Sequence, residues 1–202
     1  MAGKNPVDGE SFLQGSAGKT LVEFLEVAIT SVVFLKGIYP SGGFERTRYR
    51  SVVVHKARHP QLRHYIQSSV ASLLPFIQKG LVDRLAVIFS GPDNFPVERF
   101  IFKLDTNPIS TTKVEEVDLE SSLKQFLIKM SASEPLTKAL PKDCRWEITA
   151  YFRSIPETGT SKDVGSWAPT RTKPWQQLPF IIPIKSMCNG PVNLQLYVEH
   201  VN

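Results

Sequence analysis

The sequence Val192-Asn-Leu-Gln-Leu-Tyr-Val-Glu-His200 lies at the end of residues 153–202, the segment around which the rest of the chain is organised. Apolar and polar side chains alternate in this sequence, which predicts a half-buried strand whose outer face carries Gln195 and Tyr197. Six of the fifteen prolines fall in the same segment. Proline fixes φ and lacks a backbone donor, so these prolines exclude a helix and disfavour a central strand. Long irregular segments inside a domain are usually functional, and we expect this one to hold a partner.

The length and composition of the chain favour one intracellular domain. Its 202 residues, 42% of them hydrophobic, are enough for a substantial core, and neither a repeat nor a linker divides them. Cys144 and Cys188 lack the spacing of a zinc finger or a disulfide framework. The most apolar run, residues 27–35, is too short for a membrane span, and the polar start of the chain does not resemble a signal peptide. The formal net charge of +5 suits a protein that works beside nucleic acid or acidic partners.

Hydrophobic periodicity and turn signals predict an α+β domain, with helices packed on one side of an antiparallel sheet. The expected helices cover residues 20–38, 59–79 and 112–131, the last beginning in the capping box Thr112-Lys-Val-Glu115. The expected strands cover residues 44–57, 84–90, 95–104, 144–153 and 192–200, and the second and third of these form a hairpin. Pro75 should bend the second helix near its end.

The usual catalytic patterns are absent from the sequence, so we predict no catalytic residue, cofactor or metal. There is no Gly-x-Ser-x-Gly, His-Glu-x-x-His or dinucleotide-binding pattern. Glu23 and Glu26 fit either a catalytic pair or partners of the helix dipole and of solvent, and the second interpretation is favoured. His55, His59 and His64 have no cysteine or carboxylate cluster around them, which favours surface or capping roles over metal binding. A binding module is therefore expected.

Basic residues gather in the expected strand over residues 44–57 and just after it. Arg46, Arg48 and Arg50 alternate along the strand and should form one basic face, with Arg58 close behind. A solvated edge strand, kept from aggregating by its charges, explains this pattern. Direct binding of DNA phosphates explains it as well, and we keep that as an alternative function.

An ordered set of short motifs extends the interpretation over residues 21–199. The motifs are Glu23-Phe-Leu-Glu-Val-Ala28, Ile38-Tyr-Pro40, His59-Pro60 with Leu62, Tyr65-Ile66, Val97-Glu-Arg-Phe-Ile-Phe102, Phe126-Leu-Ile-Lys129, Pro183-Ile-Lys-Ser-Met187 and Leu194-Gln-Leu-Tyr-Val-Glu199. Together they resemble the HORMA-domain family. The resemblance implies three helices packed on an antiparallel sheet, followed by a C-terminal "seat belt" that crosses a bound peptide. Residues 1–18 are rich in Gly and Ser and are expected to be flexible, and the resemblance implies a single domain at 19–202, with its core at 19–153 and its seat belt at 154–202.

Within that family the sequence is most similar to accessory subunits of DNA polymerase zeta, relatives of the mitotic-arrest-deficient proteins. The resemblance implies that a proline-containing peptide of the catalytic subunit is trapped under the seat belt. Tyr39, Tyr65 and Trp175 match family positions that line the peptide channel, and tyrosine and tryptophan are common in interface hot spots. Core packing is the alternative role for all three side chains, and for Tyr39 the two roles are equally supported.

The resemblance implies further contacts outside the peptide channel. Ile181, Gln195 and Tyr197 match family positions that bind the C-terminal domain of a scaffold translesion polymerase. Lys124 matches a basic position used when two HORMA domains dimerise, with a solvated helix lysine as the alternative. The spacer between Trp175 and Pro183 is shorter than the family pattern.

The expected function is that of a non-catalytic adaptor in DNA damage tolerance. It would join the catalytic and scaffold subunits in the nucleus, with a cytoplasmic pool left open, would reach DNA only through its partners and would not contact a membrane. Two alternatives stay open: a cell-cycle checkpoint adaptor that inhibits a ubiquitin ligase, and direct DNA binding through the arginines described above.

Overall fold

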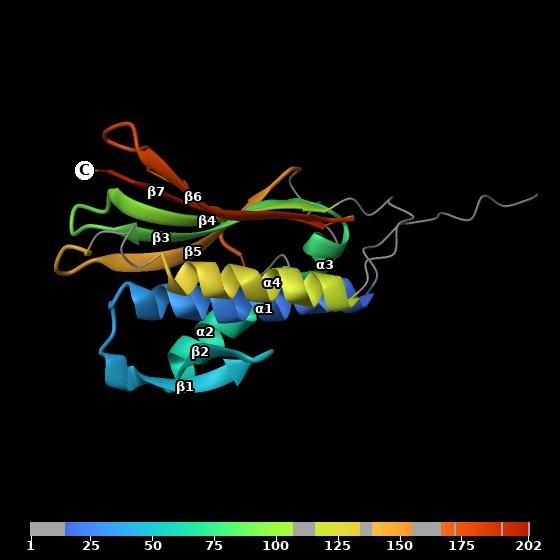
Figure 1. Ribbon diagram of the computed structural model, residues 1–202. Coiled ribbons are helices and arrows are strands. Elements are labelled where there is room, and N and C mark those ends of the chain that lie inside the picture. Colours follow the sequence, from blue (N-terminus) through green and yellow to red (C-terminus); the bar gives the residue numbers. More distant parts are fainter. Residues whose placement is uncertain are drawn as a thin grey trace, which may run out of the picture.

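The computed structural model describes residues 15–106, 116–133, 139–154, 167–171, 173–190 and 192–201. A five-stranded sheet lies over helices α1 and α4, and a separate two-stranded hairpin lies on the other side of these helices (Figure 1). The elements in chain order are α1 (Gly15–Leu35), the short 3₁₀ helix η1 (Ser41–Gly43), β1 (Phe44–Tyr49), β2 (Val52–Ala57), α2 (Pro60–Ala71), α3 (Leu74–Gln78), β3 (Val82–Ser90), β4 (Pro96–Thr106), α4 (Glu116–Ser131), β5 (Arg145–Phe152), β6 (Phe180–Asn189) and β7 (Val192–His200). The predicted α+β class is confirmed.

The order of strands in the large sheet is β5-β3-β4-β7-β6, and each neighbouring pair is antiparallel. The last strand, β7, therefore pairs with β4 in the middle of the sheet, on the opposite side of the β3–β4 hairpin from β5. Alternation along β7 is as predicted, because Leu194 and Leu196 are buried and Gln195 is exposed. The two edges of the sheet are β5 and β6.

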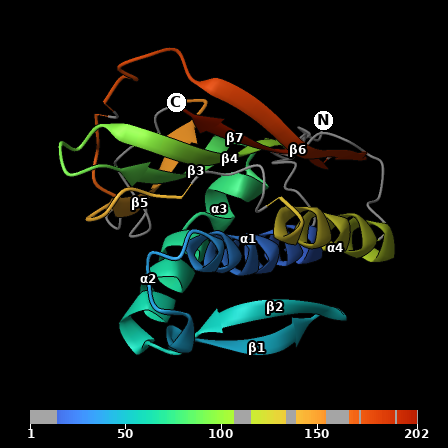
Figure 2. The same cartoon turned by 60° about the vertical axis from the view of Figure 1, so that its left-hand side comes forward.

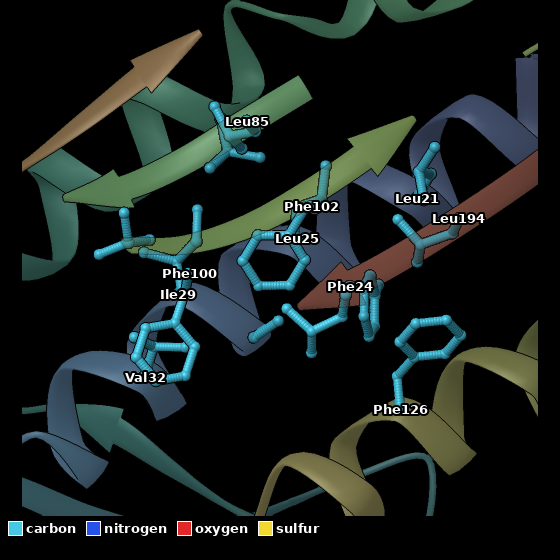
Figure 3. Close-up of a cluster of buried hydrophobic side chains, with 14 of the residues drawn as sticks. Leu21, Phe24, Leu25, Ile29, Val32, Leu85, Phe100, Phe102, Phe126 and Leu194 are labelled. Carbon is cyan, nitrogen blue, oxygen red and sulfur yellow. The ribbon is translucent and has the colours of Figure 1, made fainter. Parts of the chain in front are cut away.

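The core lies between the sheet and α1, which has apolar side chains around most of its circumference. Phe24 of α1 is at its centre, with edge-on contacts to Phe102 of β4 and Phe126 of α4 at ring-centroid distances of 6.5 and 5.9 Å (Figure 3). A fully buried side chain of this size stabilises the fold by about 1.5–3 kcal/mol. The hairpin and α4 pack on α1, and the sheet packs on it through Phe102, so this helix needs apolar residues on several faces.

The predicted continuous strand over residues 44–57 is wrong, because the chain reverses in its middle to form the β1–β2 hairpin. The two turn residues, Arg50 and Ser51, have φ values of 46° and 72°. Positive φ at both central positions is typical of a tight type I′ hairpin turn, which usually contains Asn and Gly. Arg50 points back to Glu120 and Glu23 and forms ion pairs with both. The predicted single basic face of three alternating arginines therefore does not form.

The positive φ of Ser51 in this turn predicts that a glycine at this position would stabilise the protein. Ser51→Gly should raise the free energy of unfolding by about 0.5–1 kcal/mol, because glycine adopts positive φ without the steric cost of a Cβ. Urea unfolding followed by circular dichroism measures the change. The matched control is Ser41→Gly in the exposed 3₁₀ helix, which lacks a positive φ and should not be stabilised. An unchanged or lower stability of Ser51→Gly would contradict the strain at this turn.

The helices differ from their predicted limits in three places. The first begins at Gly15 and ends at Leu35, where residues 20–38 were expected. The second is divided into α2 and α3, with Pro75 in the first turn of α3, so the proline breaks the helix instead of bending it. Together α2 and α3 lead from the hairpin side of α1 back to the sheet (Figure 2). The expected capping box at residues 112–115 lies outside the described residues.

Strand β6 is missing from the sequence-based prediction. Its Pro183 suits this strand, because β6 is an edge strand and its pairing with β7 shifts register between Pro183 and Lys185. The proline-rich segment thus ends in two paired strands, where one was expected. Within the part of the chain that the structure describes, no helix combines the length and apolarity that crossing a membrane requires.

Candidate functional site

The outer edge of β5 presents backbone groups that no strand in the described ranges pairs with. The backbone N–H of Ile148 donates instead to the hydroxyl oxygen of Tyr65 on α2, at 3.2 Å. Both backbone groups of one strand residue point to the same side, and alternate residues point to opposite sides. Trp146, Ile148 and Ala150 consequently direct their N–H and C=O groups away from β3. This edge can accept an added strand.

Aromatic side chains lie along this free edge. The ring of Tyr65 meets the ring of Trp146 edge-on at 5.5 Å, and the indole N–H of Trp146 donates to the hydroxyl of Tyr39 at 3.1 Å. Tyr39 and Tyr65 are 38% and 40% exposed, so each keeps a face for a ligand. Burial raises the pKa of Tyr65, which therefore stays protonated around neutral pH. The structure brings these two predicted residues together through Trp146.

The described residues between 167 and 175 run past β5 and end over β4 on the outer face of the sheet, from where the chain continues to β6 (Figure 2). At one end, the indole N–H of Trp167 donates to the hydroxyl of Ser72, after α2, at 2.7 Å. Farther along, Arg171 and Lys173 line a cavity of about 350 Å³ together with Trp146 of β5. We call this segment, residues 167–171 and 173–175, the crossing segment. Its path leaves the β5 edge between itself and α2.

Arg99 of β4 holds the far end of the crossing segment. Its Nη2 donates to the backbone carbonyl of Lys173 at 2.9 Å, and its guanidinium lies 4.4 Å from the centre of the Trp175 ring. Nη1 lies 3.7 Å from a carboxylate oxygen of Glu199 on β7. Trp175 therefore packs on the outer face of β4, whereas Tyr39 and Tyr65 lie at the β5 edge. The structure does not bring the three predicted peptide-binding residues into one cluster.

A second hollow lies on the outer face of the sheet over β6 and β7, with a volume of about 590 Å³. It contains all three residues predicted to bind a scaffold polymerase: Ile181, Gln195 and Tyr197. Ile181 is 62% exposed, and its neighbours Leu178 and Phe180 are also largely exposed. Burial raises the pKa of Tyr197, and Glu199 raises it further, so the phenol remains a hydrogen-bond donor. Exposed apolar side chains around a phenol and an amide are typical of a protein-binding surface.

The other candidate residues lie apart from both surfaces. Lys124 is half-buried on α4, and its predicted dimer role stays a prediction. Glu23 pairs with Arg50, and burial together with Glu23 raises the pKa of Glu26. His55 stacks on Phe34 of α1 at 3.5 Å. Within the described ranges no group of three or more His, Cys, Asp or Glu side chains is arranged to hold a metal ion.

Three contributors to these surfaces were not predicted from the sequence: Trp146, Arg99 and Trp167. Trp146 was expected only as part of the strand over residues 144–153. Its alternation is visible in the sequence, but its position at a free edge depends on the strand order. Arg99 and Trp167 act through contacts across 74 and 95 residues of sequence, and no local pattern indicates such partners.

A sheet completed by C-terminal strands, with a segment crossing its free edge, agrees with the family indicated by the motifs. The family model for the HORMA domain matches residues 18–161, and the chain belongs to this family. It is 57% identical over 186 residues to the DNA polymerase zeta processivity subunit of Arabidopsis thaliana, covering 92% of this chain and 86% of that protein. It is 28% identical over 186 residues to the mitotic spindle assembly checkpoint protein MAD2B of Danio rerio, covering 89% of this chain and 88% of that protein.

Solved structures show the same fold at low sequence identity. A chain in the crystal structure of the mitotic checkpoint complex superposes with a TM-score of 0.79 at 16% identity, covering 93% of this chain and 99% of that one. HTP-1 of C. elegans, bound to a HIM-3 closure motif, superposes with a TM-score of 0.73 at 8% identity, covering 92% and 90% of the two chains. At these identities the likeness concerns the fold alone.

Proposed function

We propose that this protein is the non-catalytic adaptor subunit of the translesion DNA polymerase zeta. It traps a proline-containing peptide of the catalytic subunit on the free edge of β5, beneath the crossing segment. Its second surface, over β6 and β7, binds the C-terminal domain of the scaffold translesion polymerase. The observation that carries the proposal is the free edge of β5 at Ile148, together with the crossing segment that passes over it and is held at Ser72 and at Arg99. The 57% identity to a polymerase zeta processivity subunit favours this partner over those of a checkpoint adaptor.

The geometry of the β5 edge suits a peptide that contains proline. An added strand gains affinity from backbone hydrogen bonds to the edge, here at Trp146, Ile148 and Ala150. Proline lacks an N–H, so it fits such a strand only where its nitrogen points away from the edge. The exposed rings of Tyr39 and Tyr65 lie where a proline ring can pack on them. Release then requires the crossing segment to open, so dissociation should be slow.

Binding of a synthetic peptide tests this capture. A proline-containing peptide from the catalytic subunit should bind the full chain, and the variant carrying Tyr65→Ala and Trp175→Ala should bind at least tenfold more weakly, because hot-spot aromatics contribute about 2 kcal/mol or more. Fluorescence anisotropy with a labelled peptide gives both affinities. Val53→Ala, at an exposed apolar position of the distant hairpin, is the control and should bind as the wild type does. Equal affinity of the wild type and the aromatic variant would reject the proposal.

The second surface should be separable from peptide capture. Gln195→Ala combined with Tyr197→Ala should abolish binding of the scaffold polymerase C-terminal domain, because both side chains line the β6–β7 hollow. The same variant should keep the affinity for the peptide, since the hollow and the β5 edge are on opposite edges of the sheet. Titration calorimetry with each partner measures the two effects. Joint loss of both partners, with the fold intact by circular dichroism, would argue against two independent surfaces.

The proposal also places the protein in the nucleus and lets it reach DNA through its partners. Arg50, one of the arginines considered for direct DNA contact, is paired with Glu120 and Glu23. Arg46, Arg48 and Arg58 remain exposed. A salt-dependent mobility shift of DNA by the isolated protein would favour direct binding instead. A fluorescent fusion excluded from the nucleus would contradict the proposed location.

A further inference from the structure

We infer that the cavity beneath the crossing segment is an anion site, which binds a carboxylate or phosphate group carried by the captured peptide. The inference rests on the proposed capture of a peptide at the β5 edge and adds a specificity that the edge alone does not supply. The cavity has a volume of about 350 Å³ and lies where β3, β4 and β5 come close to residues 170, 171 and 173.

The lining of this cavity is strongly basic. Four of its side chains are cationic: Arg99, Arg145, Arg171 and Lys173. Glu147 is the carboxylate in the lining, and it accepts a hydrogen bond from the hydroxyl of Thr149 at 3.4 Å. Glu199 also pairs with Arg99 from the neighbouring strand. Even with both carboxylates counted, positive charges exceed negative charges by two, so the cavity attracts an anion.

The cationic groups of the cavity have donors to spare. Neither Arg145 nor Arg171 takes part in any ion pair that the structure shows among its described residues. Among the described residues, the one hydrogen bond that Arg145 makes is long, 3.5 Å, to the side-chain oxygen of Asn94. The buried Nε of Arg99 has no acceptor within the described part of the chain. A buried donor without a partner is costly, and an anion in the cavity would offer the missing acceptor.

The cavity is placed where a captured peptide leaves the edge. Trp146 belongs both to the free edge of β5 and to the cavity lining, and Arg145 is the first residue of β5. A strand paired along Trp146, Ile148 and Ala150 therefore passes the cavity mouth at one end. The next few residues of the peptide then lie beneath the crossing segment, beside Arg171 and Lys173. The anionic group should consequently lie on one flank of the paired residues, at a fixed distance from them.

Arginine is suited to this task because its planar guanidinium binds carboxylates and phosphates through two parallel hydrogen bonds. Two arginines, one on β5 and one on the crossing segment, give the anion contacts on both sides. An anion that bridges Arg145 and Arg171 also ties the crossing segment to the sheet. Recognition of the peptide and closure over it would then be linked, and an acidic flank would slow dissociation.

A selection from a random peptide library that contains one fixed proline tests the inference. The wild-type full chain should enrich Asp or Glu at a constant distance from the proline. The variant with Arg145→Gln and Arg171→Gln should still select proline peptides but lose that enrichment. The variant with Arg46→Gln and Arg48→Gln removes the same charge from the distant β1–β2 hairpin and should keep it.

A second arm measures the affinity of one selected peptide with glutamate, glutamine or phosphoserine at the enriched position. The wild type should bind the glutamate form about tenfold more tightly than the glutamine form, as expected for a charge-assisted hydrogen bond, and the Arg145/Arg171 variant should bind both alike. Tighter binding of the phosphoserine form would identify phosphate as the preferred anion. Selection of proline peptides without acidic enrichment overturns the anion site and leaves peptide capture intact. Enrichment that survives in the Arg145/Arg171 variant overturns it as well, and failure to select any peptide refutes both proposals.

Discussion

Lys36→Met is expected to lower the free energy of unfolding by about 3–5 kcal/mol, because it leaves the buried carboxylate of Glu98 without its cation. Lys36 follows α1, and its Nζ lies 2.5 Å from Oε2 of Glu98 on β4, with side chains only 2% and 3% exposed. A charge removed from water to this extent is stable only beside an opposite charge. Urea unfolding followed by circular dichroism gives the difference, and Lys142→Met, at an exposed lysine, should change stability by less than about 0.5 kcal/mol.

The double variant with Lys36→Met and Glu98→Leu separates the cost of an unpaired charge from the value of the pair itself. Replacing a buried ion pair by apolar side chains of similar volume is often neutral, so the double variant should recover most of the stability that Lys36→Met loses. Losses that simply add would show that the two side chains stabilise the fold independently.

The position of this ion pair links the core to the C-terminal strands. Glu98 lies opposite His200 in the β4–β7 register, and His200 lies opposite Phe180 of β6. Lys36 therefore joins the end of α1 to the sheet where β7 ends and β6 begins. Weakening this corner should loosen the docking of β7, and the proposed binding of the scaffold polymerase to the β6–β7 hollow should weaken with it.

Most of the helices and strands could be predicted from the sequence, because their apolar residues recur with the period of the element. The misses have local physical reasons. The hairpin turn at Arg50 and Ser51 has positive φ without glycine or asparagine, and ion pairs to Glu120 and Glu23 hold Arg50 there. Strand β6 was not predicted, because Pro183 argues against a strand. A proline is accepted in an edge strand and at a register shift, and both apply to Pro183, but neither can be recognised before the strand pairing is known.

The candidate sites were predictable only in part. Alternation along β7 predicted that Gln195 and Tyr197 point to the outer face of the sheet. In the structure both line one hollow together with Ile181. Tyr39 lies in the loop after α1 and Tyr65 lies on α2, and both contact Trp146 at the β5 edge. Contacts of this kind depend on which strands are neighbours, and strand order is not written in any local pattern.

Arg99→Ala should make a captured peptide dissociate roughly 30-fold faster, a loss of about 2 kcal/mol in the closed complex. The side chain of Arg99 is 11% exposed and combines a hydrogen bond to the Lys173 carbonyl with a stacking contact on Trp175. Removing it frees the end of the crossing segment from the sheet. Stopped-flow displacement of a labelled peptide measures the dissociation rate, and Arg48→Ala, on the exposed β1 strand, is the control that should leave it unchanged.

The same measurement decides how Trp175 acts. If Trp175 holds the crossing segment through Arg99, then Trp175→Ala should accelerate dissociation to a similar extent, and the double variant should be little faster than either single variant. Arg99→Lys should fall between the wild type and Arg99→Ala, because lysine keeps the charge but loses the planar group that stacks on the indole. If Trp175 contacts the peptide directly, its effect should instead multiply with that of Arg99→Ala. A normal dissociation rate for Arg99→Ala would mean that closure does not depend on this contact, and the other anchor, Trp167 on Ser72, would then be the one that keeps the segment closed.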